Sequence, residues 1–174
     1  MKKDNRGFSL VEMMVVIGII VILASLLRAS TYALFSSSTR NCAEKINAFI
    51  AKGRVDAMSR AGEILIFIGT DSEGVYGEYH GPAGLIGKRE RLGDTRVKLE
   101  AGATGLGNIP LDSMTLSLSF NRATGGLSQF GLGGDTKMDF KAGDMAQIII
   151  TSAGKPYKVT IVATTGKHEV VSGS

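Results

Sequence analysis

A single carboxylate interrupts a long apolar run near the N-terminus. Residues 8–27 contain one ionisable side chain, that of Glu12. A charged side chain at the centre of a membrane-spanning helix costs about 2.5–3.5 kcal/mol on insertion scales, and less near the interface. An acid kept within such a run is therefore a candidate functional residue. The chemistry that it offers is the neutralisation of a positive charge in apolar surroundings.

The run that contains Glu12 has the length and the flanks of a membrane span. Its 20 residues would rise about 30 Å as a helix, which is the thickness of the hydrocarbon core of a bilayer. The leader Met1–Gly7 carries three basic residues and one acid. Basic residues before a span keep the N-terminus in the cytoplasm. We therefore expect the rest of the chain to lie on the other side of the membrane.

Two ordinary interpretations explain only part of this N-terminus. A cleaved secretory signal requires small residues around a cut site soon after the apolar run. A cut after Ser30 would place Arg28 where a small residue is required, so that site is poor. The site after Ala33 is only a passable match to the small-residue pattern. A plain membrane anchor explains the length of the run but not the presence of Glu12.

A third interpretation rests on residues 7–12. Their sequence is Gly-Phe-Ser-Leu-Val-Glu, and it follows a short basic leader and opens the apolar run. It resembles the cleavage and methylation motif of type IV prepilins and type II secretion pseudopilins. The resemblance implies that prepilin peptidase, a membrane aspartyl protease, cuts between Gly7 and Phe8 and then N-methylates Phe8. The implied partners of the processed chain are other pilins or pseudopilins in a filament, and the cytoplasmic membrane.

The physical chemistry of residues 7–12 agrees with that resemblance. Glycine has no side chain, so the backbone at Gly7 can enter a narrow protease cleft. A cut there creates a charged amine at Phe8, and Glu12 lies one helical turn further on. Where helices pack side by side, the Glu12 carboxylate could neutralise the Phe8 amine of a neighbouring subunit and favour one axial register. The alternative is that Glu12 only reaches the membrane interface.

The chain beyond the apolar run keeps a helix-compatible pattern. Residues 28–61 contain no proline and one glycine, Gly53, and apolar residues recur there at helical spacing. A helix over residues 8–61 would be about 80 Å long, with Gly62 as its stop. The polar stretch 36–41 has low helix propensity and is a candidate break. The apolar run lacks the proline of many major pilins, which favours a minor subunit.

Residues 63–174 predict a β-rich head. Because no second long helix is expected, the fold class is α+β: a pilin-like fold in which the long N-terminal helix packs on an antiparallel β-sheet head. The expected domains are a leader at 1–7, a transmembrane and filament-core helix at 8–30, an amphipathic continuation at 31–62 and the head at 63–174. Strands are expected at 64–68, 75–79, 95–100, 115–120, 146–151, 157–163 and 168–171, with a hairpin turn at 154–156.

The head also resembles the GspH/FimT group of minor pseudopilins. The stretch 81–113 fits this resemblance least and is a candidate insertion. Three other segments carry the resemblance. The first segment is the passage from the helix to the first strand, with Arg54, Asp56 and Ala57; the second contains Phe120 and Gly125; the third is the turn Thr165-Gly166-Lys167.

Other residues that could do chemistry form no recognisable site. Because Cys42 is the one cysteine, an intramolecular disulfide is excluded. Cys42 is expected as a small apolar residue on a helix face, with an intermolecular bridge as the alternative. Residues 102–108 are rich in glycine but lack the strand-then-helix context of a nucleotide loop, so a turn is expected. His80 and His168 have no nucleophile and orienting acid near them in sequence. The chain is therefore expected not to be an enzyme and to bind no cofactor.

Some pseudopilins bind calcium in the head, and three acids here invite the comparison. The spacing of Asp135, Asp139 and Asp144 does not match the EF-hand loop. Solvated loop acids are the better interpretation, so no metal is expected.

The expected function is that of a structural subunit, a minor pilin or pseudopilin of a type IV pilus or a type II secretion filament. Its expected place is the cytoplasmic (inner) membrane, single-pass, with the head on the periplasmic or extracellular side. The alternatives are a major pilin of a type IV or competence pilus, and a membrane-anchored binding domain with a prepilin-like anchor. Secreted protein or DNA is a further candidate partner, with DNA binding assigned to a basic strip at 88–91, Arg96 and Lys98; acids within this stretch favour a solvated loop instead.

Overall fold

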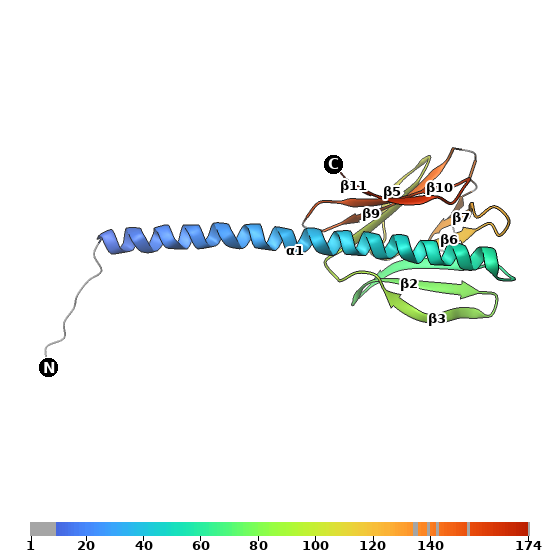
Figure 1. Ribbon diagram of the computed structural model, residues 1–174, viewed down its shortest axis with the longest axis horizontal. Coiled ribbons are helices and arrows are strands. Elements are labelled where there is room, and N and C mark those ends of the chain that lie inside the picture. The colour runs from blue at the N-terminus through green and yellow to red at the C-terminus, as the bar shows by residue number, and fades with distance from the viewer. Residues whose placement is uncertain (1–9, 134–135, 139, 142, 153, 174) are drawn as a thin grey trace. The chain divides into compact units, whose positions relative to one another are not determined.

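The computed structural model describes residues 10–173 apart from 134–135, 139, 142 and 153, and it describes no side chains at 26–36 or 134–139. In this part of the chain, one helix precedes a series of antiparallel strands, which confirms the α+β class (Figure 1). The elements are α1 (Leu10–Ser59), β1 (Leu65–Asp71), β2 (Gly74–Gly81), β3 (Gly84–Arg91), β4 (Lys98–Ala103), β5 (Leu106–Pro110), β6 (Leu116–Phe120), β7 (Leu127–Leu132), β8 (Thr136–Met138), β9 (Met145–Thr151), β10 (Tyr157–Val162) and β11 (His168–Ser172).

The chain divides into two compact units, Met1–Leu34 and Phe35–Ser174. In its described part, the first unit is the N-terminal half of α1. The second unit contains the C-terminal half of α1 and the strands.

Helix α1 continues through the polar stretch 36–41 without a break. The hydroxyl of Ser38 donates a hydrogen bond to Asp94 Oδ2 at 2.9 Å, and Thr39 Oγ1 lies 2.7 Å from Ser152 Oγ. Both hydroxyls are therefore engaged with the head, and the helix persists through this stretch. The helix ends just before Gly62, whose φ of 107° is the left-handed conformation expected of a helix stop.

Among the described residues, no helix has both the length and the apolar character needed to cross a bilayer. The span predicted at residues 8–27 is thus not borne out there, and the described side chains include neither residues 8–9 nor residues 26–27 of that run.

The C-terminal half of α1 packs closely on the sheets of the head. Its buried side chains share one hydrophobic core with residues from both sheets. Phe49 stacks on Tyr79 of β2 with ring centroids 4.1 Å apart, and the Tyr79 hydroxyl donates to the Phe49 carbonyl at 2.7 Å. A Cβ at Gly53 would lie 2.3 Å from Ile66 Cδ1 of β1, so glycine at this position allows the helix to approach the sheet.

The head contains two antiparallel sheets where the sequence predicted one. The larger has the strand order β3-β2-β1-β6-β7-β8, and the smaller has the order β11-β10-β9-β4-β5. Figure 1 shows β2 and β3 on one side of the C-terminal half of α1, and β9, β10 and β11 on the other. The chain moves between the sheets after β3, after β5 and after β8, which a pattern read along the sequence does not reveal.

All seven predicted strands are present, but β3, β5, β7 and β8 were not predicted. The stretch 154–156 joins β9 to β10, which pair antiparallel with Tyr157 opposite Ile150, so the predicted hairpin is confirmed. The glycine-rich residues 102–108 lie in the hairpin of β4 and β5, with Gly105 at a φ of 83°. The stretch 81–113 supplies β3, β4 and β5, and β4 is an inner strand of the smaller sheet.

Candidate functional site

The predicted processing site falls at the start of the described chain. Gly7 and Phe8 lie outside the described residues, and α1 begins at Leu10. Glu12 lies in the first turn of α1 with its side chain exposed. Because the N-terminal end of a helix carries partial positive charge, an acid is favourable at this position. The carboxylate is therefore accessible to a partner from outside the chain.

The helix around Glu12 exposes apolar side chains on every side. Leu10 is 73% exposed, Val11 67% and Met14 69%, and the large apolar residues continue exposed to Leu23. An apolar surface of this extent marks a site of membrane or protein contact. The arrangement can thus supply one carboxylate within a surface that is otherwise suited to lipid or to other apolar helices.

A second set of residues joins α1 to both sheets through Arg54. Its Nε donates to the Gly125 carbonyl at 2.8 Å, and its Nη2 donates to the Thr165 carbonyl at 2.9 Å. Gly125 and Gly166 have φ values of 67° and 63°, a conformation that favours glycine. A Cβ at Gly166 would lie 1.9 Å from the Gly125 carbonyl oxygen, so the two turns touch through backbone. The structure therefore brings together the C-terminal part of α1, the turn at Gly125 and the turn at Thr165–Gly166.

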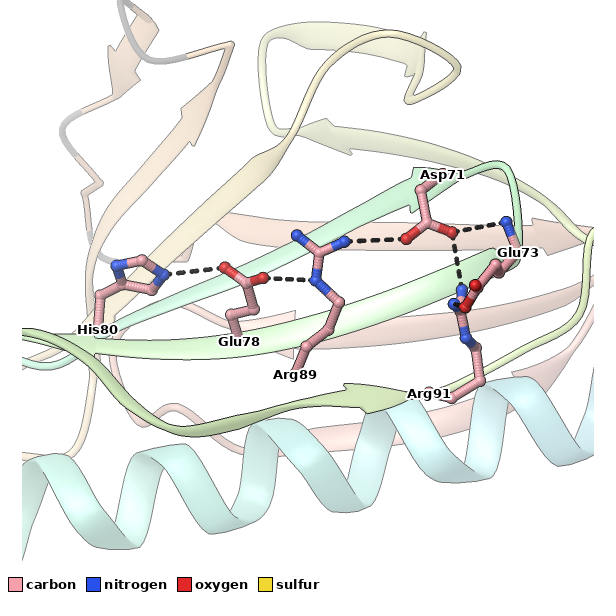
Figure 2. Close-up of polar contacts among 6 residues, drawn as sticks. All are labelled: Asp71, Glu73, Glu78, His80, Arg89 and Arg91. Carbon is pink, nitrogen blue, oxygen red and sulfur yellow. Dashed lines mark hydrogen bonds and ion pairs between the residues drawn. The ribbon is translucent and has the colours of Figure 1, made fainter.

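A line of charged side chains crosses β1, β2 and β3. We call it the polar row, and its members are Asp71, Glu73, Glu78, His80, Arg89 and Arg91 (Figure 2). Arg89 bridges two strands, since its Nε lies 2.6 Å from Glu78 Oε1 and its Nη1 lies 2.9 Å from Asp71 Oδ2.

Both ends of the polar row are also paired. Arg91 Nη1 lies 2.8 Å from Asp71 Oδ1, and its Nη2 pairs with Glu73. His80 Nε2 lies 2.9 Å from Glu78 Oε2. Because β3 is an edge strand of the larger sheet, these contacts hold an edge in place through side chains as well as backbone.

The polar row stabilises the ionised forms of Asp71 and Glu78. The hydrogen bond from Arg91 lowers the pKa of Asp71, with further help from the Glu73 amide and Arg89. The hydrogen bond with His80 lowers the pKa of Glu78, and Arg89 lowers it further. Such pairing raises the pKa of both arginines.

We expect acid to loosen β3 selectively. A carboxyl whose pKa is lowered on folding stabilises the fold above its ordinary pKa, and this contribution is lost as pH falls toward the folded value. Between pH 7 and about pH 3, amide hydrogen-exchange protection factors should therefore fall more in β3 than in β11. Strand β11 is the matched control, because it is also an edge strand and has no ion pair among the described residues. An equal loss of protection in both strands would contradict this role of the polar row.

The arginines of the candidate basic strip at 88–91 are paired with acids. The interpretation of this stretch as a solvated loop is wrong: Lys88–Arg91 form part of β3. The pattern misled because a strand at a charged sheet edge has no apolar alternation. Arg89 and Arg91 are committed to the acids of the polar row, and Arg96 Nη2 lies 2.7 Å from Asp94 Oδ2. The guanidinium groups of these arginines are thus paired with acids, whereas the side chains of Lys88 and Lys98 are exposed.

The remaining candidates from the sequence have ordinary structural roles where they are described. Cys42 is buried on a face of α1, and burial raises the pKa of its thiol to about 12. Asp144 accepts a hydrogen bond from the Lys141 amide, whereas Asp135 and Asp139 lie outside the described residues. The described part of the chain contains no group of three metal-ligating side chains. His168 Nδ1 lies 3.0 Å from the Gly166 carbonyl oxygen.

Comparison with known families bears on the N-terminus alone. Residues 2–27 match the prokaryotic N-terminal methylation motif. The N-terminal segment is therefore type IV prepilin-like, and this motif implies processing by prepilin peptidase and assembly with other pilins. Neither the curated proteins nor the solved structures give a significant match to the chain.

Sequence reasoning did not identify the acids of the polar row. Tyr76, Glu78 and His80 alternate on β2, and this spacing places them on one face of the strand. This alternation could have indicated the polar row from the sequence. Arg89 and Arg91 are also two residues apart, which places both on one face of a strand. The pattern alone does not say which acids those arginines meet.

Proposed function

We propose that this chain is a minor pilin or pseudopilin of a type IV pilus or a type II secretion filament. Prepilin peptidase removes residues 1–7 and methylates the amine of Phe8, as the methylation motif at residues 2–27 implies. The processed chain, which now begins at Phe8, then joins a filament through the N-terminal part of α1. The observation that carries the proposal is the exposed Glu12 carboxylate in a helix surface that is otherwise apolar.

Glu12 is the assembly residue in this proposal. Cleavage places a new ammonium group at Phe8, close to apolar surface that a filament or a membrane would cover. A buried charge without a partner is strongly destabilising, whereas a paired one is tolerated. The Glu12 carboxylate of one subunit therefore neutralises the Phe8 amine of the next, and helices that pack out of register lose this pairing.

The proposed place of the chain is the cytoplasmic (inner) membrane before assembly, and the filament afterwards. The support is the sequence of residues 8–27, in which Glu12 is the one ionisable group, and the basic leader before it. The head then lies on the periplasmic or extracellular side. Its proposed role is structural and not enzymatic.

Membership of the GspH/FimT group is the finer part of the proposal. Its support is the Arg54 contact, since the segments that resemble this group meet there although they are distant in sequence. The absence of proline from residues 8–27 favours a minor subunit over a major one. The abundance of the chain in purified filaments separates these two classes.

The processing step is tested by mass spectrometry of the membrane-extracted chain. In cells that have prepilin peptidase, the mature protein should begin at Phe8 and carry one methyl group, and in cells without it the leader should remain. Gly7→Glu should remain uncut in both strains, because a long charged side chain is expected to obstruct the protease cleft. Lys3→Glu is the control for a charge change within the leader. A start at Met1 in cells with the peptidase, or a cut near residue 30 or 33, would contradict the proposal.

A further inference from the structure

The larger sheet has a hollow on the face that points away from α1. Strand alternation establishes this face: Ile66 and Tyr79 contact the helix side, so Phe67, Glu78 and His80 point the other way. The hollow has a volume of about 400 Å³, which lies within the range of small-molecule sites, roughly 300–1,000 Å³. Its lining consists of Phe67, Tyr76, Glu78, His80, Ser113, Thr115 and Gly133.

Three rings of the hollow are held in fixed positions. The rings of Phe67 and His80 meet edge-on, with centroids 4.8 Å apart and an interplanar angle of 74°. The guanidinium of Arg89 lies 3.9 Å from the centroid of the Tyr76 ring. Tyr76 also lies across Gly69 of β1, where a Cβ would come within 2.8 Å of the tyrosine oxygen. The rings are half-buried, so part of their apolar surface is accessible to a ligand.

The charge within the hollow is already compensated. The two carboxylate oxygens of Glu78 are paired, one with Arg89 at 2.6 Å and the other with His80 at 2.9 Å (Figure 2). A cationic ligand would have to displace one of these partners. An anionic ligand would meet the Glu78 carboxylate and the acids of the polar row, whose arginines are engaged. The electrostatics of the site therefore favour a neutral ligand.

Hydroxyl groups supply the free hydrogen-bonding capacity of the hollow. Within the described residues, the hydroxyls of Tyr76, Ser113 and Thr115 have no hydrogen-bond partner. A hydroxyl can both donate and accept, which suits ligands that carry many hydroxyls of their own. The negative faces of aromatic rings attract the weakly positive C–H groups of such ligands.

These features describe a ligand with apolar C–H faces, many hydroxyls and no net charge. We propose that the hollow on β1 and β2 binds a neutral saccharide. Phe67 contacts the C–H face of the sugar ring, the hydroxyls of Tyr76, Ser113 and Thr115 bind its hydroxyls, and Glu78 is fixed by Arg89 and His80 as an acceptor at the edge of the site. This activity belongs to the head and does not depend on cleavage at Gly7.

The test uses the full chain in a polyoxyethylene detergent, because the sugar headgroup of a maltoside would compete. Glucose, galactose, N-acetylglucosamine, maltose and cellobiose are screened by saturation-transfer NMR, and affinity is then measured by titration. At least one of them should bind. Tyr76→Phe should weaken binding about threefold to tenfold, the cost of one hydrogen bond, and Phe67→Ala should weaken it more strongly. Tyr157→Phe on β10 is the matched control and should bind like the wild type.

Three outcomes would overturn the proposal. The first is that no saccharide of the panel binds. The second is that Tyr76→Phe binds the sugar as tightly as Tyr157→Phe does, while its buried Cys42 thiol reacts with a thiol reagent as slowly as in the wild type, which shows that the head is folded. The third is that inorganic phosphate or a sulfated oligosaccharide binds the hollow more tightly than the neutral sugars.

Discussion

Replacing Gly166 by alanine is expected to destabilise the head by about 2–5 kcal/mol. The left-handed conformation at this residue, with φ of 63°, costs a non-glycine residue about 1–2 kcal/mol. The new Cβ would also lie 1.9 Å from the Gly125 carbonyl oxygen, and such overpacking costs about 1–3 kcal/mol. The obstacle is backbone and not a flexible side chain, so the turns must separate. The carbonyls that Arg54 binds would then be displaced.

The measurement uses Cys42 as a reporter of the head. This single thiol is buried, so a thiol reagent reacts with it only when the core opens. The urea dependence of Cys42 labelling in the full chain should shift to lower concentration in Gly166→Ala. Gly105→Ala is the matched control, because Gly105 has a φ of 83° but no atom within 4 Å of its would-be Cβ. If both variants lost the same stability, the contact between the two turns would not be the cause.

Replacing Glu12 by alanine is expected to block assembly while leaving cleavage intact. The carboxylate lies beyond the cut site, so the peptidase should still release Phe8. The new ammonium group then enters the filament without a partner, and an unpaired buried charge costs roughly 3–5 kcal/mol. Incorporation into filaments should therefore fall at least about tenfold. Immunoblotting of sheared filaments, with intact mass as the measure of processing, checks both parts of this result.

Two further variants separate pairing from a general effect of charge. Glu12→Asp keeps the carboxylate and should retain part of the assembly. Glu44→Gln removes another exposed acid of α1, one that pairs with Arg40 on the same helix, and should assemble normally. If Glu12→Ala were cleaved and still assembled like the wild type, Glu12 would have no role in pairing.

The two predictions test different halves of the chain. The Gly166 variant acts within residues 35–174, where α1 and the sheets share one core. The Glu12 variant acts in the exposed apolar part of α1 and should leave the protection of Cys42 unchanged. A chain that fails in assembly but keeps a protected thiol therefore has a folded head, and a failure of the saccharide test would affect neither result.

The sequence by itself determined the prepilin-like motif at the N-terminus and the order of the main elements. The prepilin-like motif consists of residue types at fixed spacing within a few residues, so it needs no tertiary structure, and the match at residues 2–27 confirms it. The long helix and seven strands were also predictable, because hydrophobic periods of 3.6 and 2 are properties of short stretches. Strand β3 was missed because its side chains are charged, and its apolar contacts are few.

Only the tertiary structure decided how the strands divide into two sheets and which charges meet. Arg54 binds carbonyls 71 and 111 residues further along the chain, and Arg91 pairs with an acid 20 residues before it. The hollow on β1 and β2 likewise depends on Ser113, Thr115 and Gly133, which are distant from both strands in sequence. The physical reason is that strand pairing and side-chain partners are selected by burial and register among all segments at once, whereas a sequence pattern reports only the preference of each segment alone.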